Sequence, residues 1–114
     1  MAPEERDAAL LLDLLTAARE IEGFLGGADL HRFQSDRLLR YAVERQLIVI
    51  GEAVRRLSDS FKAGTPGVPW KAIVGLRNIL AHEYGEILAE RVWLVASRDI
   101  ANLIENLQDH LPRD

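Results

Sequence analysis

The chain has 114 residues and a net charge of −4 at pH 7, and it contains no cysteine. This length suits a single domain over residues 1–114 with a modest core of its own. The missing cysteines exclude disulfides, thiolate nucleophiles and zinc–thiolate sites. The acidic balance argues against a protein that coats nucleic acid, so any such contact needs a small site with basic residues gathered around it. Five arginines could form that gathering, although arginines on a helix are more often simply solvated: Arg37, Arg40, Arg45, Arg55 and Arg56.

The N-terminus carries Glu4, Glu5, Arg6 and Asp7, which is too much charge for the start of a signal peptide. No apolar run approaches the ~20 residues that a membrane-spanning helix needs. We therefore expect a cytoplasmic protein that does not enter a membrane.

Helical periodicity dominates the chain, and no stretch alternates in the manner of a strand. Pro3 suits the first turn of a first helix, and Gly26 and Gly27 are expected to end it. Residues 29–34 predict a connector with at most a short helix. The inward face of the first helix is expected to consist of Leu11, Leu14, Leu15, Ala18, Ile21 and Leu25.

A long second helix is predicted over residues 36–62, with Ser35 as its N-cap. Gly51 lies inside this helix, where a glycine costs about 1 kcal/mol, and its expected use is a close contact between helices. The apolar residues follow nearly heptad spacing and form one stripe. They are Leu39, Val43, Gln46 or Leu47, Ile50, Val54, Leu57 and Phe61.

Residues 63–69 are rich in glycine and proline and predict a loop. A third helix is expected from Trp70 to about Tyr84, where Gly85 stops it, and a fourth over residues 88–109. The expected fold is all-α, an up-and-down four-helix bundle with or without a short fifth helix in the connector. The fourth helix should face the core with Val92, Val95 or Ala96, Ile100, Leu103, Leu107 and Leu111.

The end of the third helix carries the residues best suited to chemistry, Arg77, Asn78, His82 and Tyr84. An imidazole can move protons near neutral pH, and a guanidinium binds phosphate oxygens through a planar set of donors. Arg77 and His82 lie about 140° apart on the helix. We therefore expect a second copy of the helix to complete the site across a two-fold axis, the alternative being an arginine that bends over. Asn78, one turn before His82, could orient the imidazole.

These residues also have a less specific interpretation, because an isolated arginine and histidine on a helix usually serve packing or solubility. Spacing alone likewise favours Tyr84 as an ordinary residue at the boundary of an amphipathic helix. His82-Glu83 lacks the second histidine of an H-E-x-x-H motif, which argues against a zinc site, and the chain has neither a Walker loop nor a G-x-G-x-x-G motif. We therefore expect no metal and no other cofactor. Glu52, beside Gly51, could reach the same groove as a polar support.

The pattern Arg77-Asn78-x-x-x-His82-x-Tyr84 resembles the R-N-x-x-x-H-x-Y signature of HepT-type toxins, within the HEPN superfamily of helical ribonucleases. Two further segments resemble the family, Val-Ile-Gly-Glu-Ala at residues 49–53 and Val-Pro-Trp-Lys-Ala-Ile-Val-Gly-Leu at residues 68–76. With Ser58 and Asp59, the resemblance covers nearly the whole chain. It departs mildly after the motif, where residues 85–88 lack an aspartate that is often found there.

The resemblance implies a HEPN-like homodimer in which Arg77 and His82 of both subunits line a cleft. It also implies metal-independent cleavage of RNA, in which His82 acts as general base or acid and Arg77 stabilises the phosphorane. The implied partner is a minimal nucleotidyltransferase antitoxin that transfers AMP to Tyr84. The added bulk and negative charge beside Arg77 would oppose RNA entry.

Two functions therefore follow. The first is a toxin-type endoribonuclease that cleaves RNA by 2′-hydroxyl attack and is silenced by its nucleotidyltransferase partner. The second is a non-catalytic helical subunit that binds a nucleotide or docks a nucleotidyltransferase, which the net negative charge favours. An RNase assay on alanine variants of Arg77 and His82 separates the two.

Overall fold

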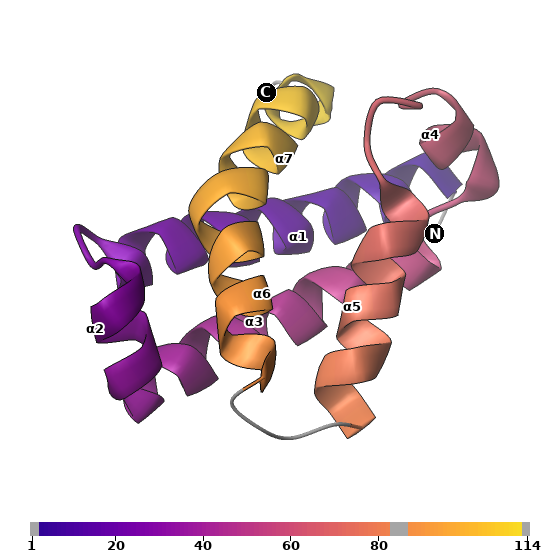
Figure 1. The fold of residues 1–114 in the computed structure, drawn as a ribbon. Helices are drawn as coiled ribbons and strands as arrows, with labels where there is room; N and C mark the ends of the chain where they lie inside the picture. The colour runs from indigo at the N-terminus through magenta and orange to yellow at the C-terminus, as the bar shows by residue number, and fades with distance from the viewer. Residues whose placement is uncertain (1–2, 83–86, 113–114) are drawn as a thin grey trace.

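The computed structural model describes residues 3–82 and 87–112, and in these ranges the chain is helical with no strand (Figure 1). Two long helices, α1 (Pro3–Leu25) and α3 (Arg37–Arg56), form the largest helix–helix contact among these residues. Helix α5 (Trp70–His82) packs on α3. The bundle is therefore built on one central helix pair.

The last long helix packs across α1 and consists of three consecutive segments. These are α6 (Ile87–Leu94), a π-helical turn η1 (Val95–Asp99) and α7 (Ile100–Leu107), with a short 3₁₀ turn η2 (Gln108–His110) after them. The connector contains α2 (Leu30–Ser35), which is the short fifth helix. The predicted all-α helical bundle is confirmed. None of the described helices is long and apolar enough to cross a membrane.

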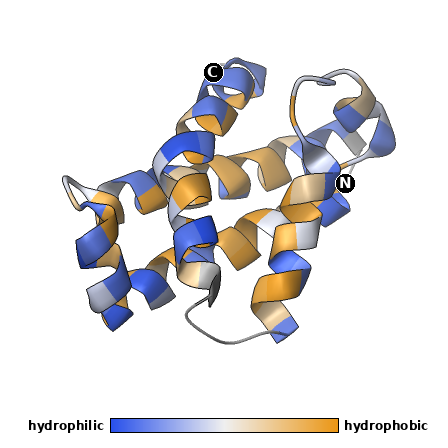
Figure 2. Ribbon diagram, in the orientation of Figure 1, coloured by the Kyte–Doolittle hydropathy of each residue, from blue (hydrophilic) through white to orange (hydrophobic). Residues whose placement is uncertain are grey.

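The core lies between these helices, and each long helix has a hydrophobic and a hydrophilic side (Figure 2). All the positions predicted to face inward on the first helix are buried. The stripes predicted for the second and fourth helices are also buried, except that Leu39, Gln46, Phe61, Val95 and Leu111 are only partly so. Helix α1 ends as predicted, because Gly26 adopts a φ of 52°, which a glycine tolerates without strain.

The prediction of Ser35 as the N-cap of the second long helix is wrong. Ser35 is the last residue of α2, and its hydroxyl donates to the carbonyl of His31 at 3.0 Å. Asp36 caps α3 instead, since its side chain accepts a hydrogen bond from the amide of Leu39 at 3.0 Å. Both residue types are good N-caps, so local preference could not decide between neighbours.

The second helix is also shorter than predicted, because it ends at Arg56 and not at Lys62. Ser58 has extended backbone and caps a separate short helix, α4 (Asp59–Ala63). The carboxylate of Asp7, at the start of α1, accepts hydrogen bonds from the Ser58 amide at 2.9 Å and from its hydroxyl at 2.6 Å. This contact between distant parts of the chain stabilises the break between α3 and α4.

The fourth helix begins at Ile87 and contains a wide turn that the sequence did not predict. The amide of Ile100 donates to the carbonyl of Val95, five residues back, as in a π-helix. The predicted end of the third helix at Tyr84 and its stop at Gly85 lie outside the described residues.

Candidate functional site

Arg77 of α5 packs directly against the backbone of α3 at Gly51. A Cβ atom on residue 51 would overlap the Cβ of Arg77 and lie 2.6 Å from its Cγ. The side chain of Arg77 is only 21% exposed. Glycine at position 51 therefore allows the aliphatic stem of the arginine to lie on α3, and the predicted close contact between helices is confirmed.

Two polar groups hold the guanidinium of Arg77. Its Nη2 forms an ion pair with Oε1 of Glu52, and its Nη1 donates to Oδ1 of Asn78 at 3.0 Å. The same Glu52 carboxylate lies 3.4 Å from Nη1 of Arg55. The Nε of Arg77 is buried and has no hydrogen-bond partner among the described residues. The guanidinium is thus oriented by residues of two helices, and these two contacts do not use all five of its N–H donors.

Asn78 is exposed, and its side-chain oxygen accepts from Arg77. Within residues 3–82 and 87–112 no hydrogen bond joins Asn78 to His82, so the expected orienting contact is made to the arginine instead. His82 is the last residue of α5 and is exposed. Tyr84 lies outside the described residues. The structure therefore brings Arg77, Asn78 and Glu52 together and leaves the imidazole accessible at the end of the same helix.

Helix α3 leaves one of its sides uncovered next to this cluster. Leu38 is 82% exposed and Tyr41 57% exposed. Helical geometry places both in line with Arg45 and Glu52. Large apolar side chains that gather in solvent beside polar groups mark a surface for another molecule. We call Leu38, Tyr41 and Arg45 the open face of α3; the sequence did not single out its two apolar members.

The five arginines expected to gather around the site have different surroundings. Arg55 contacts Glu52 and Arg45 lies on the open face, whereas the Nε of Arg40 is buried without a hydrogen-bond partner among the described residues.

Glu44 lies one turn after Arg40 and is partly buried. Burial raises the pKa of the Glu44 carboxyl, and the charge of Arg40 opposes this rise. Glu44 therefore takes up a proton more readily in the folded chain than in the unfolded one.

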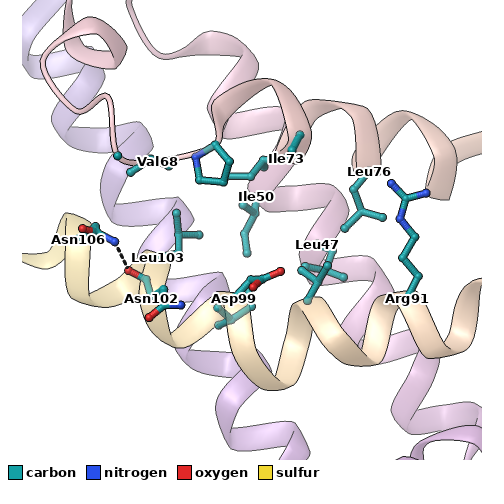
Figure 3. A pocket seen from close by; sticks show the side chains of 15 residues that line it. Leu47, Ile50, Val68, Ile73, Leu76, Arg91, Asp99, Asn102, Leu103 and Asn106 are labelled. Atoms are coloured by element: carbon teal, nitrogen blue, oxygen red, sulfur yellow. Dashed lines mark hydrogen bonds between the residues drawn. The ribbon is translucent and has the colours of Figure 1, made fainter.

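A cleft of about 370 Å³ opens between α5 and the last helix (Figure 3). Its floor and its α5 wall are apolar, and polar side chains stand along the opposite wall. Neither Arg77 nor His82 lines it, so the predicted reactive groups do not open into this cleft. In the described ranges no group of three or more His, Cys, Asp or Glu side chains is placed to hold a metal. The polar wall consists of Arg91, Asp99, Asn102 and Asn106.

Comparison with known proteins places this chain in a class of proteins described as ribonucleases. A family model described as "Ribonuclease HepT-like" matches residues 14–109. A Methanocaldococcus jannaschii protein named "Putative RNase" is 37% identical over 100 residues, which cover 88% of this chain and 92% of the relative. A Thermococcus cleftensis protein named "Probable ribonuclease HepT" is 31% identical over 93 residues, which cover 82% of this chain and 84% of the relative. No solved structure matches.

The chain belongs to the HepT-like ribonuclease family. The family resemblance predicted from the sequence is confirmed.

Proposed function

We propose that this protein is a metal-independent endoribonuclease, the toxin of a toxin–antitoxin pair. The observation that carries the proposal is the guanidinium of Arg77, fixed by Glu52 and Asn78 on a helix that ends in an exposed histidine. A cation whose position is set before the substrate arrives stabilises developing charge without reorganisation at the moment of reaction. Relatives named as RNases support the same activity.

In the proposed reaction, the 2′-oxygen of one nucleotide attacks the adjacent phosphorus, and the bond from phosphorus to the leaving 5′-oxygen breaks. His82 takes the proton from the 2′-hydroxyl or delivers one to the leaving oxygen. Arg77 binds the equatorial oxygens of the phosphorane through its planar N–H donors. The products are a cyclic phosphate and a 5′-hydroxyl.

Substitution of His82 tests this mechanism. His82→Ala should abolish cleavage of RNA in buffer with EDTA while circular dichroism shows an unchanged helical content, and Arg77→Ala should do the same. His31→Ala is the matched control, because His31 is exposed on α2. Cleavage that persists in His82→Ala would remove this histidine from the mechanism.

We infer that two copies of the chain form the active unit. Arg77 and His82 lie about 140° apart on α5, so a second subunit could supply the side that one copy lacks. The open face of α3 adjoins Glu52 and offers the apolar residues that a pairing surface needs. Leu38→Glu should shift the mass measured by light scattering from dimer to monomer, and an unchanged dimer would contradict this pairing.

The proposed regulation rests on the family resemblance. A nucleotidyltransferase antitoxin would transfer AMP from ATP to the Tyr84 hydroxyl, with release of pyrophosphate. The added negative charge would then compete with RNA for Arg77. Intact-mass analysis of the peptide that contains Tyr84, from cells with and without the partner gene, tests this: equal masses would contradict it.

A non-catalytic subunit that binds a nucleotide or docks a nucleotidyltransferase is the second candidate. The net charge of −4 and the exposed apolar residues of the open face favour it. It predicts that the unmodified wild-type protein cleaves no RNA and yet forms a stable complex with the nucleotidyltransferase. Cleavage by the pure wild-type protein, lost in His82→Ala, would exclude it.

A further inference from the structure

An open groove lies at the N-terminal half of α5, beside the end of α3 and the short helix α4. Its volume is about 960 Å³. It differs from the cleft between α5 and the last helix because its lining includes three cations, Arg55, Lys62 and Lys71. Asn78 also lines this groove and at the same time holds the guanidinium of Arg77. The groove therefore adjoins the candidate site.

The charge of this groove is opposite to that of the whole chain. Both lysines of the sequence line it, and Asp59 is the one acidic residue in its lining. Lys62 is anchored, since its Nζ donates to the carbonyl of Val54 at 3.3 Å. Lys71 is exposed in the first turns of α5. A local excess of cations in an acidic protein attracts a polyanion to one place and not to the surface at large.

The groove also contains a fixed aromatic ring, that of Trp70. Its indole N–H donates to the carbonyl of Thr65 at 3.2 Å, and its ring lies against the ring of Phe61 with 6.2 Å between centroids. Trp70 is only partly buried, so one part of its surface remains open to the groove. Cations beside an aromatic ring are the combination that binds single-stranded nucleic acid, because phosphates meet the charges and a base stacks on the ring.

We propose that this groove binds the single-stranded RNA next to the scissile phosphate, with Lys71 and Arg55 on phosphates and Trp70 under a base. The inference rests on the proposed nuclease function and adds to it the residues that hold the strand. Of the five arginines that the sequence offered for this task, Arg55 alone is in the groove lining. The two lysines take the place of the others.

RNA binding by a non-cleaving protein tests the groove directly. The background is His82→Ala, and the probe is a short fluorescein-labelled single-stranded RNA of mixed sequence, measured by anisotropy at several salt concentrations. Lys71→Glu should weaken binding about tenfold and lower the slope of log K against log salt by roughly 0.7. Arg19→Glu on α1 is the matched control: Arg19 is exposed and outside the groove lining, and each variant changes the net charge from −4 to −6.

The control should change the dissociation constant less than twofold. Equal weakening by both variants would overturn the proposal, because it would show that only net charge matters. An unchanged constant in Lys71→Glu would overturn it as well.

Stacking on Trp70 has its own readout. Trp93→Phe leaves Trp70 as the one tryptophan of the chain, and saturating RNA should quench its fluorescence. Emission that does not respond at saturation would overturn the stacking. The test distinguishes failure of the groove proposal from failure of the nuclease proposal. If the wild-type protein binds RNA in the groove but does not cleave it, the proposed nuclease function is wrong. If Lys71→Glu cleaves RNA with an unchanged KM, the proposed binding of RNA in the groove is wrong.

Discussion

Replacing Gly51 with alanine should impair RNA cleavage far more than it impairs folding. The new Cβ would lie 2.6 Å from the Cγ of Arg77. Ordinary van der Waals contact needs about 3.5 Å, so the two helices must separate by about 1 Å at this point. Such overpacking costs about 1–3 kcal/mol, while alanine gains about 1 kcal/mol of helix propensity over glycine. The net loss should be roughly 0–2 kcal/mol, less than the ~5–15 kcal/mol that keeps a domain folded.

The loss of activity should be larger because the same shift moves the guanidinium. A displacement of about 1 Å at a reacting centre can reduce a rate ~100-fold. Urea unfolding gives the stability, and cleavage of a labelled RNA gives kcat and KM. Gly23→Ala is the matched control, since Gly23 lies in α1 and a Cβ there meets nothing within 4 Å. A Gly51→Ala protein that is about 1 kcal/mol more stable than wild type and fully active would refute the close approach.

Three further predictions concern stability, measured by urea unfolding. Glu52→Gln should lower the free energy of unfolding by about 0.5–1 kcal/mol, since Arg77 loses a half-exposed ionic partner; a double-mutant cycle with Arg77→Ala should then show coupling, and additive losses would contradict the pair. Asp7→Ala should cost about 1–3 kcal/mol, because the amide and hydroxyl of Ser58 lose their acceptor. Burial raises the folded pKa of Glu44, so its contribution to stability is present below the ordinary value of 4.5 and is lost as pH rises through the folded pKa. Glu44→Gln should therefore stabilise the protein more at pH 7 than at pH 4, and an equal effect at both would refute the shift.

Much of the fold could be predicted from the sequence, because the apolar periodicity of each long helix is strong. The inward face of the first helix and its end at Gly26 needed no tertiary information. The break after Arg56 could not be predicted, since it depends on Asp7, which lies far away in the sequence. Local patterns report local preference, whereas this hydrogen bond joins two residues that only the folded chain brings together.

The candidate site was predictable in part. The motif indicated Arg77 and Asn78, and the odd position of Gly51 in a helix indicated a close approach. The partners of the guanidinium were not predictable, because its contact with Glu52 joins two different helices. The lysines of the groove were missed for a similar reason: Lys62 and Lys71 flank a loop, and only the folded chain places them beside Arg55.

The wide turn η1 has a consequence for how this chain tolerates changes in length. A residue inserted into an ordinary α-helix rotates everything after it by 100° and would turn the apolar face of α7 away from α1. A π-turn accommodates one surplus residue within a single loop of backbone. Deletion of Ser97, an exposed residue inside the turn, should leave a shorter but regular helix, so this helix has a built-in place where its length can change by one.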